Sequence, residues 1–401
     1  GAIIAKLSID NLLEYFYVAP KYLGAVDAVN LVTEGGKRFA EIAGQLTEVV
    51  VVGSKDIAEM IVPGDPGVYV VNSGSTGVAE TFFALGIIYF VVMIIAAFSY
   101  RIPREGWLPQ GWVPPTTEKA QSKMITQNDV HIDQALKTPQ FYLIWVVLCF
   151  NVTAGIGVIG VAKTMMTEIF GSTLPFIVNA SYAGTYVLMI SVFNMTGRFF
   201  WASISDYIGR KVTYYIFFIL GIFLYLSIPY TAIKVQASPA AIWLVIFYAA
   251  TMIIFTMYGG GFATIPAYLA DIFGTRFVGG IHGRLLTAWS TAGVLGPLAI
   301  TQLRESSRIN AIETLAAKID PAVFERTYGA GINQLSQLVE TKTVTISNLM
   351  VVVPSGVTNP SPTLYNTTMY VMAGLLAIAL IANIFVKPVH ERHHMKDNGS
   401  T

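Results

Sequence analysis

The sequence predicts an all-α polytopic membrane protein, on the strength of three features. Hydrophobic residues make up 54% of the 401 residues and charged residues only 12%, whereas a soluble domain carries about 25% charged residues. The hydrophobic residues are gathered in stretches of roughly 20, the length that a helix needs to cross a bilayer. Segments rich in Pro, Gly and charged residues separate these stretches. Lipid must therefore cover part of the surface.

Charge and cysteine usage exclude several classes of protein. The net charge is +1, so the chain carries no basic field for nucleic acid. The single cysteine, Cys149, lies in an apolar run and cannot form an intramolecular disulfide. The tail histidines, His390, His393 and His394, are more typical of a solvated tail near lipid headgroups than of a metal site. We therefore expect no metal, no cofactor and no nucleic-acid partner.

Seven stretches qualify, or nearly so, as membrane-spanning helices. All but the third are uncharged, and the third contains Arg198. Residues 1 to about 17 resemble the second half of a further span, which suggests that the chain begins within a longer protein. In chain order the stretches are Thr81–Tyr100, Phe141–Ala162, Leu174 to about Ser205, Val212–Ile233, Ala241–Ala270, Leu285–Leu303 and about Asn366–Val386.

Lysine and arginine residues next to the spans set the expected orientation, because short cytoplasmic loops are enriched in them. They are concentrated in the 101–138 segment, in the 206–211 turn and in the tail. These regions fall on one side if the seven spans alternate, and we place that side, with the C-terminus, in the cytoplasm. The 21–78 and 304–365 segments then lie outside. The 102–138 segment is typical of a linker between two helical bundles.

The two outer segments are too long for simple connections. The first is predicted to hold a helix over Thr33–Leu46 and strands over Glu48–Val52 and Gly67–Val71. The second is predicted to hold a helix over Arg308–Lys318 and a strand over Val344–Val353. We expect small inserts of mixed α/β character, which either pack together as a cap or form two independent loops.

Arg198 is the strongest single indication of function. An arginine within a span costs roughly 3 kcal/mol on insertion scales and persists where it faces a polar cavity. If Asp206 marks the helix end, Arg198 lies about 12 Å deeper, close to the middle of the bilayer core. The alternative is an interfacial arginine that reaches water. Asn194 lies four residues earlier on the same helix face, so guanidinium and amide could bind a carboxylate together, although Asn194 could equally bond another helix.

The turn from Ala202 to Lys211 carries a recognisable pattern. It resembles the cytoplasmic loop motif of the major facilitator superfamily, Gly-x-x-x-Asp-x-x-Gly-Arg-Arg/Lys, with Ala202 in place of the first glycine. The pattern suits a gate, because Asp206 can pair with basic groups and Gly209 permits a tight turn. The expected gating residues are Gly197, Asp206, Gly209, Arg210 and Lys211.

In that superfamily the motif joins spans two and three and, again, spans eight and nine. Three long spans and a tail follow it here, so it matches the second copy. The resemblance implies a complete C-terminal six-helix half, a truncated N-terminal half that lacks spans one to four, and a site between the halves. The expected segments are 1–20 (end of span five), 21–78 (outer insert), 79–101 (span six), 102–138 (linker), 139–303 (spans seven to eleven), 304–365 (outer insert), 366–387 (span twelve) and 388–401 (cytoplasmic tail).

Within the superfamily the chain resembles the oxalate/formate antiporter family, which is related to the monocarboxylate transporters. The residues that carry the resemblance are the run Phe-Asn-Met-Thr-Gly-Arg at 193–198, the glycine-rich run 259–271 and the run 285–297. The resemblance implies that Arg198 binds the substrate carboxylate and that Asn194 assists. It also implies a multi-pass protein of the bacterial inner membrane, which we expect to be a monomer.

One departure from the family bears on the substrate. Oxalate carriers use a lysine in span eleven to hold the second carboxylate, and Trp289 stands at the matching position. A doubly charged substrate would leave one charge poorly compensated, which favours a monocarboxylate. Trp289 itself, Tyr258 in the glycine-rich span ten and Asn151 in span seven are further candidates for substrate contact, with ordinary helix packing as the alternative.

The residues and the resemblance together predict a secondary active transporter of a small monocarboxylate of the formate, lactate or pyruvate class, and not an enzyme. It would work by alternating access in the bilayer. Asn194 stands where the monocarboxylate family carries an aspartate, so exchange against a counter-anion is at least as well supported as proton symport. The alternatives are oxalate/formate-type dicarboxylate exchange and a transporter-like sensor that binds a carboxylate without moving it.

Overall fold

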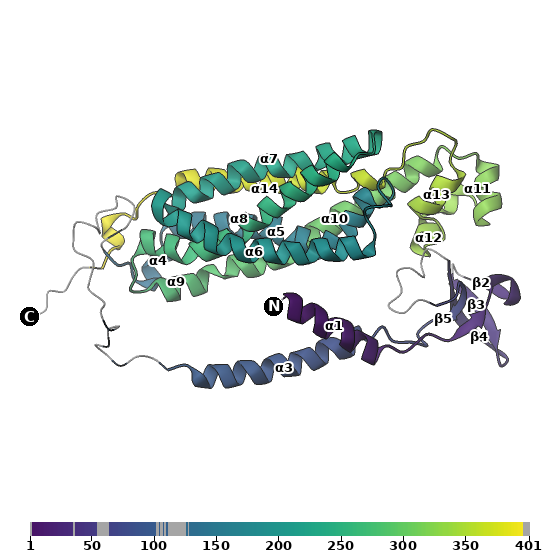
Figure 1. Cartoon of the computed structure of the whole chain (residues 1–401), viewed down its shortest axis with the longest axis horizontal. Helices are drawn as coiled ribbons and strands as arrows, with labels where there is room; N and C mark the ends of the chain where they lie inside the picture. Colours follow the sequence, from purple (N-terminus) through teal and green to yellow (C-terminus); the bar gives the residue numbers. More distant parts are fainter. Residues whose placement is uncertain are drawn as a thin grey trace, which may run out of the picture. The chain divides into compact units, whose positions relative to one another are not determined.

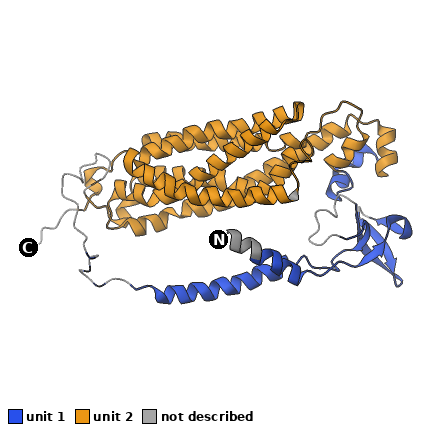
Figure 2. Ribbon diagram, in the orientation of Figure 1, with its two compact units in different colours: residues 1–114, 330–344 blue, residues 115–329, 345–401 orange. Residues whose placement is uncertain are grey.

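The structure, a computed structural model, describes residues 2–34, 37–53, 64–101, 104, 107, 110, 126 and 128–395. The chain divides into two compact units (Figure 2). Unit 1 comprises Gly1–Pro114 and Ala330–Val344, and unit 2 comprises Pro115–Gly329 and Thr345–Thr401. Most of the described residues are helical, and a small sheet lies in unit 1 (Figure 1). The predicted 102–138 linker lies largely outside the described residues.

Unit 1 holds an antiparallel sheet. Its strands follow helix α1 (Ala2–Phe16) and precede helix α3 (Val78–Ser99) in the chain. The five strands lie in the order β1-β5-β4-β3-β2. Ala40, Val49 and Val68 form the buried core of the sheet. Unit 1 also holds η1 (Val26–Ala28), η2 (Ile332–Gln334) and α12 (Leu335–Glu340). The strands are β1 (Tyr22–Gly24), β2 (Leu31–Glu34), β3 (Lys37–Ile42), β4 (Gln45–Val52) and β5 (Gly67–Val70).

The sheet corrects one prediction for the first insert. The helix expected over Thr33–Leu46 is wrong, because this stretch holds the end of β2, all of β3 and the start of β4. Ala43 and Gly44 turn the chain between β3 and β4 with φ angles of 51° and 82°. Such left-handed angles end a helix but suit a tight hairpin. The strands expected over Glu48–Val52 and Gly67–Val71 are confirmed as parts of β4 and β5, with β5 ending at Val70.

Unit 2 is a helical bundle, in which α6 packs against α8, α5 against α10 and α14, and α7 against α8 and α14 (Figure 1). The chain alternates in direction from α5 to α8. The 206–211 turn and the end of α8 therefore lie at one end of the bundle, the motif end, and residues 170–180 lie at the opposite end. The helices are α4 (Ile132–Ala135), α5 (Pro139–Phe170), α6 (Ala180–Ile208), α7 (Arg210–Ala237), α8 (Ala241–Phe273), α9 (Val278–Leu285), α10 (Thr287–Ala316), α11 (Pro321–Tyr328), α13 (Ile346–Val352) and α14 (Asn366–Phe385), with short 3-10 turns at Ser361–Thr363 and Glu391–His393.

Six helices of the described part of the chain are long and apolar enough to cross a membrane: α3, α5, α6, α7, α8 and α14. The seventh predicted span, Leu285–Leu303, is helical as the first part of α10, but it is not among these six. Its polar content explains the difference, since α10 carries several Ser, Thr and Gln residues and continues into the charged run after Leu303. The prediction of long helices is therefore confirmed, and six of the described helices have the length and hydrophobicity of membrane spans.

Local capping accounts for two further corrections. Helix α6 begins at Ala180 and not at Leu174, because the Asn179 side chain accepts a hydrogen bond from the Tyr182 N–H at 2.9 Å and so caps the helix. The strand expected over Val344–Val353 is wrong. A reciprocal capping box between Thr345 and Asn348 starts α13 there instead. The described elements of the second insert are thus helical rather than mixed.

Candidate functional site

The site begins with a close approach of α6 and α8. A Cβ placed on Gly197 would lie 2.2 Å from the carbonyl oxygen of Thr256, and one on Gly259 would lie 2.0 Å from the carbonyl oxygen of Asn194. No larger residue could occupy these positions without moving a backbone, so the two helices are in near backbone contact. This contact fixes the height of Arg198 on α6 relative to Phe262 on α8.

Arg198 is held by an amide and an aromatic ring. Its Nε donates to the Oδ1 of Asn194 at 3.3 Å, and its Cζ lies 5.0 Å from the centroid of the Phe262 ring. Arg198 lies ten residues before Ile208, the last residue of α6, which is about 15 Å along the helix and half of a bilayer core of about 30 Å. Among the described carboxylates none forms an ion pair with this exposed guanidinium. Its charge is therefore available to an anion.

Two more of the predicted residues join this group. Trp289 on α10 packs against Phe262, with ring centroids 4.8 Å apart, and against Tyr258, with centroids 5.9 Å apart. Tyr258 is buried and its ring also fills the space beside Gly155 on α5. The structure thus brings together residues from α6, α8 and α10 around one guanidinium. We call Arg198, Asn194, Phe262, Tyr258 and Trp289 the arginine site.

Asn151 is placed differently from the other candidates. It is buried on α5, and a Cβ on Gly261 would lie 2.6 Å from its Nδ2. That Nδ2 has no hydrogen-bond partner among the described residues. Asn151 lines a cavity of about 10 Å³ with Tyr225, Tyr258 and Leu376, which is room for one water at most. It therefore reaches Tyr258 from the bundle interior, and no contact with Arg198 joins it to the arginine site.

Four of the predicted gating residues, Asp206, Gly209, Arg210 and Lys211, lie at the motif end, whereas the fifth, Gly197, lies at the close approach of α6 and α8. Gly209 adopts a φ of 88° between α6 and α7, a conformation that favours glycine. Arg210 forms an ion pair with Asp206 one turn earlier, and its Nε lies 3.8 Å from an Oδ2 of Asp271 at the end of α8. Asp271 is buried, so Arg210 supplies a charge that this carboxylate needs. One side chain thereby joins the ends of three helices.

Lys211 joins the same end to α14. Its Nζ donates to the carbonyl oxygens of Ile384 at 3.1 Å and Val386 at 2.6 Å, where α14 ends and carbonyls lack helical partners. Asn383 returns a hydrogen bond from its Nδ2 to the Lys211 carbonyl at 3.1 Å. The motif therefore fixes the start of α7 against α14 as well as against α8.

Sequence reasoning missed the roles of Phe262, Asp271 and Asn383 in these contacts. Asp271 carried a signal, since it is an acidic residue at the very end of a long apolar stretch, where a buried carboxylate needs a cation. The pairing of Arg198 with Phe262 carried none, because it depends on how α6 and α8 are aligned. Sequence spacing shows only which residues share a face of one helix.

Comparison with known proteins identifies the family of the chain. Residues 66–297, more than half of the chain, match the Major Facilitator Superfamily. The chain is similar to the oxalate:formate antiporter of Oxalobacter formigenes, with 29% identity over 220 residues, which are 55% of this chain and 46% of the relative. The chain thus spans about half the length of the curated relative that it matches. The matched residues cover α3, all of α4 to α9 and the start of α10, and so include Arg198, Asn194, Tyr258 and Trp289.

Proposed function

Because this multi-pass membrane chain belongs to the major facilitator superfamily, we propose that it is a secondary transporter of a small monocarboxylate of the formate, lactate or pyruvate class. The superfamily consists of transporters, and its two halves enclose a midplane site that opens to each side of the membrane in turn. The finer assignment rests on the arginine site and on the likeness to a carboxylate antiporter.

The observation that supports a carboxylate substrate is the way in which Arg198 is held. The Phe262 ring lies against one face of the guanidinium, and Asn194 occupies only its Nε. The terminal N–H groups can then donate two parallel hydrogen bonds to a carboxylate, the geometry in which arginine binds this group best. The position near mid-depth is where a superfamily transporter binds its substrate.

The aromatic side chains around Arg198 favour a single negative charge. Trp289 lies against Phe262 and Tyr258, so aromatic rings rather than a second cation surround this side of the site. Apolar rings would leave a second charge poorly compensated. The second candidate function is exchange of oxalate for formate, and the similarity to the oxalate:formate antiporter of Oxalobacter formigenes favours it.

Exchange of one anion for another is the coupling that we propose. The residue beside Arg198 is an amide that does not titrate, so it offers no proton that could move with the substrate. We further propose that the contacts of Arg210 with Asp206 and Asp271 form when the motif end is closed and break when it opens. Such a change would let the same arginine site face each side in turn.

Uptake into proteoliposomes that contain the product of the complete gene tests the proposal. Labelled formate, lactate, pyruvate and oxalate are offered one at a time, first with and without unlabelled anion inside, then with and without a pH gradient. We expect a monocarboxylate to accumulate only when an anion is present inside. Preferred uptake of oxalate would support exchange of oxalate for formate. Uptake that depends on the pH gradient would indicate proton symport instead of anion exchange. If nothing moves while a carboxylate still protects the protein against heat, the protein is a sensor.

A further inference from the structure

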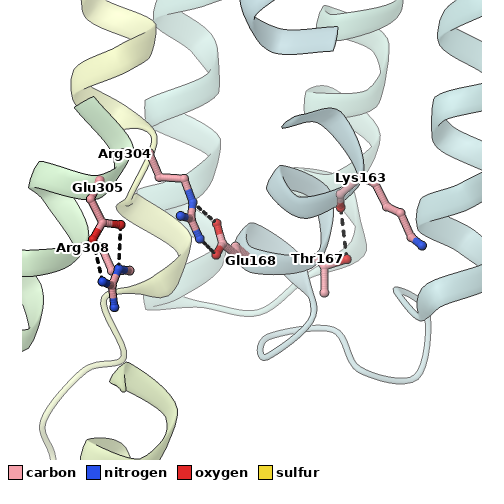
Figure 3. A network of polar contacts seen from close by, with 6 residues as sticks. All are labelled: Lys163, Thr167, Glu168, Arg304, Glu305 and Arg308. Atoms are coloured by element: carbon pink, nitrogen blue, oxygen red, sulfur yellow. Dashed lines mark hydrogen bonds and ion pairs between the residues drawn. The ribbon is translucent and has the colours of Figure 1, made fainter. Parts of the chain in front are cut away.

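The end of the bundle opposite the motif carries charges that the predicted spans left outside the membrane. The spans were expected to stop at Ala162 and Leu303, but α5 continues to Phe170 and α10 to Ala316. Lys163, Glu168 and Arg304 therefore stand on helices of the bundle rather than in loops. Figure 3 shows these residues at close range.

Both arginines in this region are neutralised by a neighbour. Arg304 forms two hydrogen bonds with the carboxylate of Glu168, one of them from Nε at 2.9 Å. Arg308 forms two with Glu305, at 2.8 and 2.5 Å. Such paired, fork-like contacts satisfy each guanidinium and leave little net charge to attract an anion.

Lys163 is different. It forms no ion pair with any carboxylate that the structure describes, and its side chain is exposed. Its amine points away from the pair of Arg304 and Glu168 (Figure 3). Its backbone carbonyl accepts a hydrogen bond from the Thr167 hydroxyl at 3.1 Å, which is ordinary helix geometry and uses none of the ammonium donors. The charge of Lys163 is thus uncompensated, whereas the charges of Arg304 and Arg308 are each paired with a carboxylate.

Helix α5, which carries Lys163, also contacts the arginine site. Gly155 touches the ring of Tyr258 on one side, and Gly157 packs against Gly296 of α10 on another. Gly160 has open space beside it. Lys163 lies eight residues after Gly155, which places it about 12 Å further along the helix and rotated by about 80°. It therefore lies between the opposite end of the bundle and the level of Tyr258, on a helix that contacts Tyr258.

We propose that Lys163 captures the substrate anion at this end of the bundle and raises the rate at which it reaches the arginine site. This inference rests on the proposed function. An ammonium is a strongly hydrated point charge on a flexible stem, so it attracts an anion without the two-point grip of an arginine. A charge at the rim of a site acts mainly on the association rate and its dependence on salt, whereas a charge within the bound complex acts on the dissociation rate.

Stopped-flow binding of the preferred monocarboxylate to the product of the complete gene tests this role. The signal is the change in tryptophan fluorescence, because Trp289 lies in the arginine site. We expect Lys163→Gln to lower the association rate constant about 3- to 10-fold, to flatten its dependence on ionic strength and to leave the dissociation rate constant unchanged. Lys163→Arg should keep both the rate and the salt dependence.

Lys234 offers a matched control, since it is a lysine near the same end of the bundle that lies over the ring of Tyr230. Lys234→Gln should bind like the wild type. An unchanged association rate constant in Lys163→Gln would overturn the proposal. If the dissociation rate constant rose instead, Lys163 would belong to the bound complex. If the wild type binds no carboxylate at all, the proposed function itself fails, and that result is distinct from both.

Discussion

The guanidinium of Arg198 lies over the ring of Phe262, with its Cζ 5.0 Å from the ring centroid. The two residues come from neighbouring helices whose backbones almost touch at Gly197 and Gly259. The contact therefore depends on the close approach of α6 and α8, and it leaves the terminal nitrogens of the guanidinium free to meet a substrate. Five predictions follow from this arrangement and from the charges at the motif end.

Removing the ring should weaken substrate binding. A cation–π contact contributes about 0.5 to 2 kcal/mol, so Phe262→Ala should raise the dissociation constant of the monocarboxylate about 2- to 30-fold. Phe262→Tyr keeps the π face and should stay close to the wild type. Isothermal titration of the purified protein measures both. Phe199, an exposed neighbour of Arg198 on α6, is the control, and an equal loss in Phe199→Leu would show that the effect is not specific to the ring under Arg198.

Asn194→Asp should weaken transport across the range from pH 5 to 8. The new carboxylate would stand 3.3 Å from the Nε of Arg198, where the amide oxygen now lies, and would compete with the substrate for the guanidinium. A carboxylate paired with an arginine stays ionised at these pH values, so uptake should stay low throughout the range. Initial uptake rates between pH 5 and 8 report this, with Asn194→Ala as the variant that carries no competing charge. Uptake by Asn194→Asp at the rate of Asn194→Ala would contradict the placement of this residue beside Arg198.

A methyl group on Gly197 should separate α6 from α8. The added Cβ would lie 2.2 Å from the Thr256 carbonyl oxygen, a backbone atom that cannot move aside alone. We expect Gly197→Ala to lower the melting temperature and to lose carboxylate binding together, because the shift also moves Arg198 away from Phe262. Gly374 on α14 is the control, since a Cβ there meets nothing within 4 Å. If Gly197→Ala melts and binds like Gly374→Ala, the close approach is not needed.

Arg210→Gln should destabilise the motif end. It leaves Asp271 buried without its cation, which we expect to cost about 1 to 3 kcal/mol, because the two side chains are 3.8 Å apart and Arg210 is partly exposed. Thermal unfolding in detergent measures the loss. The double variant Arg210→Gln/Asp271→Asn removes both charges and should recover much of it. An exposed arginine nearby, Arg276, gives the control, and a double variant no more stable than Arg210→Gln would argue against the pair.

The helical part of the fold could be predicted because apolar stretches of about 20 residues have few other solutions. The ends of the helices were harder, since they depend on caps. Asn179 delays α6 to Ala180, and Thr345 with Asn348 starts α13 where β-branched residues suggested a strand. Local propensity loses to such caps and to packing.

The small sheet was predicted only in part, because its order depends on pairing between strands that lie far apart in the chain. Strand β5 at Gly67–Val70 pairs with both β4 and β1, and the turn at Ala43 and Gly44 reverses what resembled a helical pattern. The Thr33–Leu46 stretch satisfied helical spacing by itself. Only its partners, which no local pattern contains, decide in favour of strands.

The candidate site divides in the same way. The sequence indicated Arg198 and Asn194 because a charge within an apolar stretch is costly, and it indicated the motif because its spacing is specific. It could not place Asn151, whose amide turns into the bundle interior beside Gly261 rather than toward Arg198. Nor could it find Lys163, because the predicted span ended one residue too early.

The central claim is that the fork of Arg198 binds the substrate carboxylate, and the most direct test compares Arg198→Lys with the wild type. Lysine keeps the charge but cannot donate the two parallel hydrogen bonds. Uptake of the preferred monocarboxylate into proteoliposomes is measured for wild type, Arg198→Lys and Arg198→Ala, each checked for folding by its melting temperature. We predict that both variants fold and that each loses at least about 10-fold in kcat/KM, as expected when a bidentate charged contact is lost. Uptake by Arg198→Lys at the wild-type rate would contradict the two-point contact, and uptake by Arg198→Ala at that rate would remove Arg198 from the site.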